Sequence, residues 1–203
     1  MEQPTDENVA AAEEQAGQEG THQSIMSALA QHASTSGENP RNDADARRRL
    51  THDLIQLQRS PCEQFSARPI DGDLYRWRAV VAGPEATPWE GGLFKLLFEF
   101  TSEYPYAPPV VRFVTKVFHP NVYVDGKICL DTLKTNWSPS LNVESLLLMI
   151  ISLLSDPNPN SAANGEAAAL YTQSRDQYDE RVQQIVLSSL EQEFSDEDES
   201  ADT

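Results

Sequence analysis

A cysteine and a histidine, two residue types used in acyl chemistry, lie close together between residues 119 and 141. This stretch, HPNVYVDGKICLDTLKTNWSPSL, has no regular helix or strand pattern, and long irregular segments inside a compact domain are usually functional. The thiolate of Cys129 could act as a nucleophile that forms a thioester. His119 could serve as its base, as in a Cys–His hydrolase. The alternative is structural, because a lone cysteine is more often a small buried apolar residue.

The second cysteine of the chain does not share this setting. Cys62 follows Pro61 just past an expected helix end, where we expect a packing or surface role. Lys127 is two residues from Cys129, and we expect its ammonium to stabilise the thiolate. Two cysteines are too few for a disulfide framework, which predicts a reducing compartment for this protein.

The elements that must position these side chains follow the order helix, strands, helices. Leu50, Leu54 and Leu57 share one face of a helix that starts at residue 44 and is ended by Pro61. Period-2 alternation and β-rich composition predict three strands, and apolar periodic segments predict three later helices. The strands are expected at 74–82, 93–100 and 110–115, and the helices at 143–154, 165–171 and 174–194. This order is typical of the α+β class.

Charge is concentrated at the two ends of the chain. The 203 residues carry a net charge of −17, of which residues 1–46 contribute −8 and residues 191–203 contribute −7. The middle is nearly balanced, as in an ordinary globular domain. From this composition we predict a disordered acidic arm at 1–43, a catalytic domain at 44–194 and a disordered acidic tail at 195–203.

Composition also excludes several classes of function. Asp and Glu number 32 against 15 Lys and Arg, which argues against direct nucleic acid binding. No apolar run reaches the ~18 residues of a membrane span. The first residues lack the basic start and the apolar stretch of a secretory signal. We therefore expect an intracellular protein without membrane association.

Several short motifs occur here together, at the spacing of one known family. They are HPN at 119–121, a cysteine eight residues later, WSP at 137–139, DPNP at 156–159 and YPYAPP at 104–109. Together they resemble the ubiquitin-conjugating enzymes over residues 44–190. The resemblance implies the ubiquitin-conjugating fold, with an N-terminal helix, a four-stranded antiparallel sheet, an active-site loop and C-terminal helices. Within the family, the sequence most resembles the subgroup that ubiquitylates histones and supports DNA-damage tolerance. The similar features are the segments ARRRL, FHPNVY and NPNS and the acidic tail.

The resemblance implies roles for Cys129, Asn121 and His119, and the chemistry of the transfer adds Asp131 and Ser161 as candidates. Cys129 would accept ubiquitin from the activating enzyme as a thioester and pass it to a substrate lysine. The amide of Asn121 would stabilise negative charge on the carbonyl oxygen or support its loop, and His119 would be structural. Asp131 would accept the proton of the attacking lysine. Ser161 stands where the family commonly has Asp or Ser, and it would gate the site.

The resemblance also implies partners and the surfaces that they contact. The activating enzyme and a RING-type ubiquitin ligase would share the first helix and two loops, at Arg47, Arg48, Arg49, Tyr106, Pro139 and Ser140. The alternative for the arginines is an ordinary solvated helix face. Basic substrates such as histones would suit the acidic ends, which could equally serve only solubility. No cofactor and no metal are implied, and we expect the nucleus and cytoplasm as the location.

Three hypotheses from different classes follow. The leading one is a ubiquitin carrier enzyme, the second is an inactive family variant that acts as a scaffold, and the third is an acidic histone-binding protein. Retention of Cys129 argues against the scaffold. Only seven residues separate Cys129 from Trp137, so the insertion of the SUMO-conjugating relative is missing, which favours ubiquitin. Lys127 replaces a serine that is common in the family, which makes it a candidate for self-modification.

Overall fold

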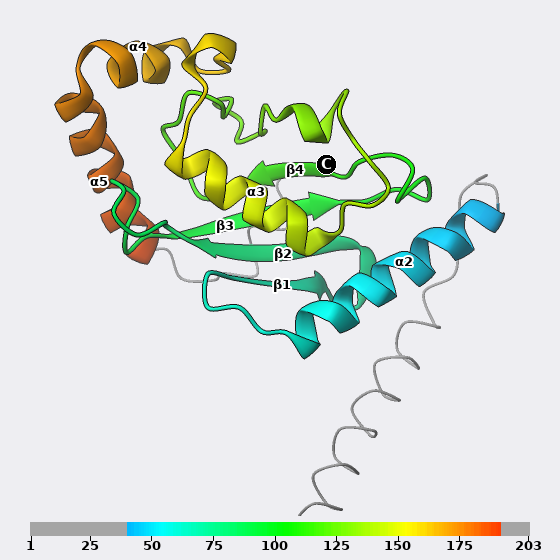
Figure 1. The fold of residues 1–203 in the computed structure, drawn as a ribbon. Coiled ribbons are helices and arrows are strands. Elements are labelled where there is room, and N and C mark those ends of the chain that lie inside the picture. Colours follow the sequence, from blue (N-terminus) through cyan, green and yellow to red (C-terminus); the bar gives the residue numbers. More distant parts are fainter. Residues whose placement is uncertain (1–39, 192–203) are drawn as a thin grey trace, which may run out of the picture. The chain divides into compact units, whose positions relative to one another are not determined.

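The computed structural model describes residues 40–191, and Figure 1 shows their arrangement. The predicted tail and most of the predicted N-terminal arm lie outside these residues. Within the described part, residues 40–70 and 74–191 belong to one compact unit. None of the helices among residues 40–191 has both the length and the apolar character that crossing a membrane requires.

Helix α2 (Pro40–Arg59) begins four residues before the predicted helix start at residue 44. Proline suits the first position of a helix, because its φ is already helical and its missing N–H would have no partner there. Asp43, in the first turn, accepts a hydrogen bond from the hydroxyl of Tyr75 at 2.5 Å. This contact ties the start of the helix to the sheet.

Four strands form one sheet in the order β1-β2-β3-β4, with antiparallel pairing of β2 with β3 and of β3 with β4. The predicted four-stranded sheet is confirmed. Three strands match expected segments: β2 (Asp73–Ala82), β3 (Leu93–Glu99) and β4 (Val110–Phe113). Strand β1 (Phe65–Ile70) was not recognised from its own sequence, because FSARPI is short, contains a proline and has only one β-branched residue.

The core lies between the sheet and helix α3 (Val143–Ser155), which runs across the sheet in Figure 1. The helix buries six apolar residues, Val143, Leu146, Leu147, Ile150, Ile151 and Leu154. On β3, Phe94, Leu96 and Phe98 are almost completely buried, because alternate side chains of a strand point to the same face. The predicted central helix is therefore confirmed.

Two further helices follow, as predicted. Helix α4 (Gly165–Gln173) packs against α5 (Arg175–Glu191), and α5 contacts β3. The hydroxyl of Ser189 accepts a hydrogen bond from the backbone N–H of Leu93 at 3.1 Å, which fixes the end of α5 at the start of β3. Two short 3₁₀ helices, η1 (Asp131–Leu133) and η2 (Pro159–Ser161), lie before and after α3 in the chain.

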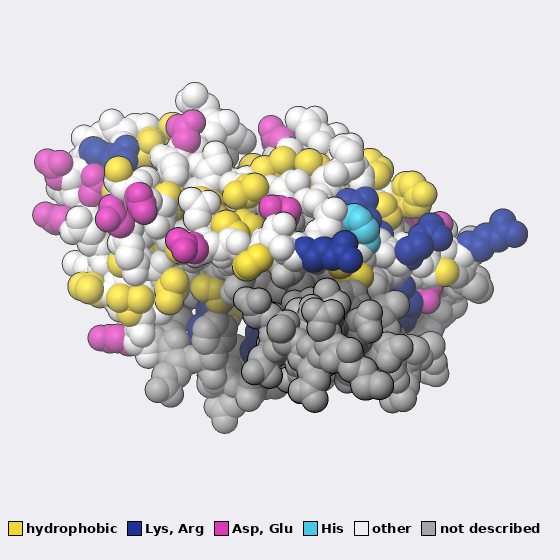
Figure 2. Space-filling view, turned by 60° about the horizontal axis from the view of Figure 1, so that its bottom comes forward, with side chains coloured by type: hydrophobic (Ala, Val, Ile, Leu, Met, Phe, Trp, Pro, Cys, Tyr) yellow, Lys and Arg dark blue, Asp and Glu magenta, His cyan; other side chains and the backbone are white. Residues whose placement is uncertain are grey.

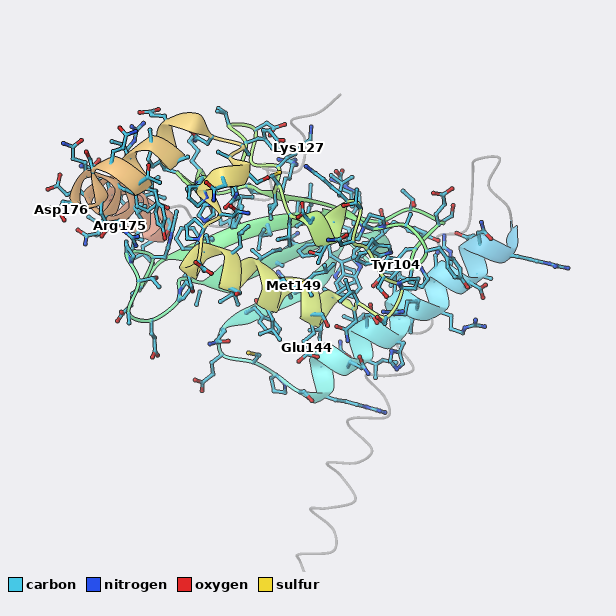
Figure 3. The ribbon with its side chains drawn as sticks, turned by 45° about the horizontal axis from the view of Figure 1, so that its top comes forward. Tyr104, Lys127, Glu144, Met149, Arg175 and Asp176 are labelled. Atoms are coloured by element: carbon cyan, nitrogen blue, oxygen red, sulfur yellow. The ribbon has the colours of Figure 1, made fainter. Side chains whose placement is uncertain are left out.

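A buried polar cluster fixes α2 to the loops of the domain. The carboxylate of Asp53, 2% exposed, accepts from Arg49 Nε at 2.9 Å and from the Tyr104 hydroxyl at 2.7 Å. The other nitrogens of Arg49 donate to the backbone carbonyls of Pro139 and Leu141, both at 2.6 Å. Burial is the main cause that raises the pKa of Tyr104 far above its usual value. Tyr104 lies beside α2 in Figure 3.

Candidate active site

Cys129 lies at the end of a narrow loop that begins at Asn121. Its backbone N–H donates to the carbonyl of Asn121 at 2.8 Å, which closes the loop. The turn of the loop contains Gly126 with a φ of +85°, and the Gly126 carbonyl accepts from the N–H of Phe113 at 2.9 Å. Strand β4 therefore fixes the loop on one side. The side chain of Cys129 is partly exposed, as a nucleophile for a large substrate must be.

The cation at the thiol is Lys134. Its Nζ donates a hydrogen bond to Cys129 Sγ at 3.2 Å, and this contact is the main cause that raises the pKa of Lys134 above its usual value. The expectation that Lys127 would take this place is wrong. Lys127 Nζ instead pairs with the carboxylate of Asp125 at 3.1 Å.

Sequence reasoning missed Lys134 because it is five residues from the cysteine. The intervening η1 turns the chain back, since Leu133 N–H donates to Leu130 O and Lys134 N–H donates to Asp131 O, both at 3.0 Å. A 3₁₀ helix has three residues per turn, so such a turn brings residues this far apart close together. The sequence feature that could have indicated Lys134 is the short segment LDTLK, because it contains the only lysine between Cys129 and α3.

His119 is fully buried and both of its ring nitrogens are engaged. Nδ1 accepts from the backbone N–H of Asn121 at 3.0 Å, so Nε2 carries the proton and donates to the carbonyl of Leu153 at 2.9 Å. Burial lowers the pKa of His119 to about 4, against the opposing effect of the Leu153 bond. In this geometry the ring has neither a free nitrogen nor access to solvent. The Cys–His hydrolase hypothesis therefore lacks its base.

Asn121 connects the cysteine loop to the segment after α3. Its side-chain nitrogen donates to the carbonyls of Asn158 at 2.8 Å and Ser161 at 3.0 Å. Its side-chain oxygen accepts from the N–H of Asn158 at 2.7 Å. Both amide hydrogens are thus used by the fold. Of the two roles that the resemblance implied, this geometry corresponds to the supporting one.

Asp131 and Ser161 lie on the two 3₁₀ helices that border the site. Asp131 begins η1, Ser161 ends η2, and both residues are exposed. The carbonyl of Pro120 accepts hydrogen bonds from the N–H groups of Ala163 at 2.8 Å and Asn164 at 3.0 Å. The segment that carries Ser161 is therefore fixed to the HPN motif. The catalytic role of Asp131 and the gating role of Ser161 stay predictions.

The residues predicted to bind partners fall into two groups. Arg48 forms an ion pair with Asp45 at 2.8 Å, and 81% of its side chain is exposed. Tyr106 is 68% exposed. Pro139 and Ser140 are also exposed. These four residues remain available for contacts.

The other two arginines have structural contacts. The guanidinium of Arg49 donates hydrogen bonds to the carboxylate of Asp53 and to the backbone carbonyls of Pro139 and Leu141. Arg47 pairs with Asp43 at 3.0 Å and lies over the ring of Tyr75. Arg49 nevertheless brings α2 next to the 139–141 segment, so two of the three predicted contact regions are adjacent. Figure 2 shows Lys and Arg side chains over α2, and mostly acidic ones over the end with α4 and α5.

The remaining candidates carry no chemistry that we recognise. Cys62 is partly exposed and forms an isolated backbone bridge with Phe65, away from the loop of Cys129. Among residues 40–191, no group of three or more His, Cys, Asp or Glu side chains could hold a metal ion.

Comparison of the amino-acid sequence with known proteins matches this chain to one family. Residues 49–186 match the family described as ubiquitin-conjugating enzyme. The chain is similar to Ubiquitin-conjugating enzyme E2 1 of Caenorhabditis elegans, 51% identical over 144 residues, which are 71% of this chain and 75% of the relative. It is also similar to Ubiquitin-conjugating enzyme E2 3 of Arabidopsis thaliana, 49% identical over 144 residues, 71% of this chain and 96% of the relative. The chain therefore belongs to the ubiquitin-conjugating enzyme family and is a ubiquitin transferase, whose partners are ubiquitin, an activating enzyme and a ubiquitin ligase.

Proposed function

We propose that Cys129 is the residue that carries ubiquitin. Its sulfur accepts the C-terminal acyl group of ubiquitin from the activating enzyme, and a lysine amine of the substrate then displaces the sulfur. The observation that supports this is a partly exposed thiol paired with Lys134 and without a histidine base. A thioester persists in water only where nothing activates water beside it, and the buried His119 cannot do so. The ammonium of Lys134 is placed where it stabilises negative charge on the sulfur.

A loading assay tests this assignment. The full chain is incubated with activating enzyme, ATP and ubiquitin, and the adduct is examined with and without a thiol reductant. We expect a reductant-sensitive adduct that Cys129→Ala abolishes and Cys62→Ala, the matched control, leaves in place. Cys129→Ser should give an adduct that resists thiols, because an ester replaces the thioester. An adduct that survives Cys129→Ala would contradict the assignment.

Three neighbouring residues assist the transfer in different ways. Asp131 accepts the proton that the substrate lysine must lose, since lysine has a reference pKa near 10.4 and attacks only as the free amine. Asn121 acts as a positioning residue that holds the segment 158–161 beside the loop of Cys129. Ser161, at the exposed end of η2, gates the approach of the substrate.

The substrates are basic proteins, in particular histones or proteins of DNA repair, presented by a RING-type ligase in the nucleus and cytoplasm. Two observations support this part of the proposal. The chain carries a net charge of −17, most of it in the terminal segments, which attracts cationic substrates over distance. The motifs ARRRL, FHPNVY and NPNS resemble those of the subgroup that acts on histones.

A further inference from the structure

The sheet has one face toward α3 and a second face turned away from it, which we call the outer face. On β2, Trp77 and Ala79 are almost completely buried in the core. Successive side chains of a strand point to opposite faces of its sheet. Arg76 and Arg78 therefore belong to the outer face, on the side of the sheet opposite α3.

Strand pairing extends this row of cations across the sheet. Residues that pair directly in an antiparallel sheet have their side chains on the same face. Val80 pairs with Lys95 on β3, and Leu97, the partner of Arg78, pairs with Arg112 on β4. Among the paired residues of β2, β3 and β4 on this face, Glu99 is the one acidic side chain, against four basic ones. The outer face is thus basic in a chain whose net charge is −17.

A groove of about 440 Å³ lies on the outer face between β1 and β2. It is lined by Ser66, Ala67, Arg68, Arg78, Ala79 and Val80. Two of these residues carry guanidinium groups, one carries a hydroxyl, and none is acidic. Guanidinium groups bind carboxylates through two parallel hydrogen bonds, which makes this the geometry for an acidic ligand.

Helix α5 ends at the corner of this face. The hydroxyl of Ser189 accepts from the N–H of Leu93 at 3.1 Å, which fixes the last turn of α5 to the first residue of β3. Leu93 pairs with Ala82 and is 48% exposed. It shares the outer face with Lys95, because the two are separated by one residue. The chain beyond Glu191 therefore starts at the edge of the basic surface.

The chain after α5 has the charge and the length to reach the groove. Residues 192–203 carry six acidic side chains and no basic one. Twelve extended residues span at most about 40 Å, whereas Val80 is one strand across and two residues along from Leu93, roughly 8 Å by the spacing of a sheet. A ligand on such a short tether binds at an effective concentration on the order of millimolar, so a weak intrinsic affinity is sufficient.

We propose that residues 192–203 bind in cis to the outer face of the sheet, with their carboxylates on Arg68 and Arg78 of the groove. The inference goes beyond the proposed function and does not depend on the role of Cys129. The bound segment closes the groove to other acidic ligands. It leaves the net charge of the molecule unchanged, so the long-range attraction of basic substrates is retained.

The acidic residues before α2 are the competing occupant within the chain. Residues 1–39 contain seven acidic side chains and no basic one. These seven are spread over positions 2–38, whereas the six at the other end lie within positions 193–202. Denser charge and a shorter tether from the edge of the outer face favour the C-terminal segment.

The test compares the backbone amide NMR spectra of two full-length proteins. One is the wild type, and the other has a neutral C-terminal segment, with Glu193→Gln, Asp196→Asn, Glu197→Gln, Asp198→Asn, Glu199→Gln and Asp202→Asn. We expect the signals of 66–68 and 78–80 to differ between the two proteins at 0.01 M salt and to coincide at 1 M, because the Debye length falls from about 30 Å to about 3 Å. The difference should not change on dilution, and the signals of α3 should coincide throughout.

A pair of arginine variants locates the binding surface. Each is prepared with the wild-type and with the neutral C-terminal segment. Arg68→Gln should reduce the difference between the two spectra to about half or less, since one of the two guanidinium groups of the groove is lost. Arg48→Gln, which removes an exposed arginine of α2, should leave the difference as it is.

Four outcomes would overturn the inference. They are spectra that coincide at low salt, differences that lie outside the groove, equal effects of Arg68→Gln and Arg48→Gln, and a difference that grows with protein concentration. The last result would assign the groove to the segment of a second molecule. Groove signals that respond to neutralising the acids of 1–39, and not those of 192–203, would assign it to the N-terminal residues.

Discussion

His119 shows how a single side chain can be placed at a reactive site and still be excluded from its chemistry. The ring is 0% exposed, and its two nitrogens are bound to Asn121 and Leu153. Such a histidine must be neutral in the folded state, because charging it would require a proton on Nδ1, where the N–H of Asn121 already donates. Its contribution is to fix the HPN motif against the end of α3.

This neutrality predicts a loss of stability in mild acid. The pKa of His119 is lowered to about 4 by burial, against a usual 6.5, so the unfolded chain binds the proton first as the pH falls. The contribution of the neutral ring is complete above pH 6.5 and is lost between 6.5 and 4. At pH 5 the free energy of unfolding should be lower than at pH 7.5 by about 2 kcal/mol from this residue.

The measurement is denaturant unfolding at both pH values for the wild type, for His119→Gln and for His52→Gln, in which an exposed histidine is replaced. His119→Gln should be less stable at pH 7.5 but should lose less stability on acidification than the wild type. His52→Gln should behave as the wild type. Equal pH dependence in all three proteins would contradict the burial argument.

Ser161 allows a prediction about access to the thioester. Its carbonyl is held by Asn121, which is bound through its own carbonyl to the N–H of Cys129. Ser161→Asp places a carboxylate at the exposed rim, which attracts the incoming ammonium and can accept its proton. We expect Ser161→Asp to discharge ubiquitin to free lysine several-fold faster than Ser161→Ala, in single-turnover assays. Identical rates for the two variants would contradict the proposed gating role of Ser161.

The sequence indicates candidate site residues but not the contacts that these residues make. HPN and the spacing to Cys129 can be read from the sequence, because these residues follow each other along the chain. The partners of Asn121 are 37 and 40 residues away, and no local pattern specifies contacts across such a separation. Lys134 was missed for a local reason, since η1 reverses the chain between it and the cysteine.

Among the elements, the hairpin-like loop before Cys129 depends on one glycine. Gly126 has a φ of +85°, and a Cβ added there would lie 2.2 Å from the backbone oxygen of Phe113. Gly91 has nearly the same φ, +82°, but a Cβ there would meet nothing within 4 Å. An alanine at Gly91 would therefore show the cost of backbone strain alone, and an alanine at Gly126 would show that cost together with the clash with β4.

We predict that Gly91→Ala costs about 1–2 kcal/mol of unfolding free energy, the strain of a left-handed alanine. Gly126→Ala should cost more and should also slow ubiquitin loading, because the loop that carries Cys129 must move away from β4. Unfolding free energies and loading rates of both variants are the measurements. Equal stability losses together with unchanged loading would show that the loop tolerates the displacement.

Regular elements were predictable to within a few residues where their periodicity was strong. Helix α3 and strand β3 have long apolar patterns, and their observed bounds match the expected ones closely. The start of α2 was misplaced because the residues before 44 are polar and show no helical spacing of apolar side chains. The first turn is held instead by the hydrogen bond between Asp43 and Tyr75 on the sheet. Strand β1 was missed because pairing in the sheet, and not its composition, makes it a strand.

At the scale of the whole molecule, charge is distributed unevenly. Residues 192–203 carry six acidic side chains and no basic one. On the described surface, basic side chains gather over α2 and acidic ones over the opposite end of the face in Figure 2. Long-range attraction of a cationic substrate by such charges is screened by salt, with a Debye length of about 10 Å at 0.1 M.

Removal of residues 192–203 should therefore weaken histone ubiquitylation at low salt and have little effect at high salt. A version with the same twelve residues in scrambled order is the control, and it should keep the wild-type rate, because steering depends on charge and not on sequence. Initial rates at several salt concentrations are the measurement. An effect of the deletion that does not change with salt would rule out steering.

The scarcity of lysine has a practical consequence for handling the protein. Dyes or solid supports coupled through side-chain amines can reach Lys116, Lys127 and Lys134, which are exposed, but not the buried Lys95. A tag on Lys134 would lie next to the sulfur of Cys129 and obstruct it. Fluorescent or immobilised preparations made in this way will contain a blocked fraction, so attachment through a residue engineered on α5 is the safer choice.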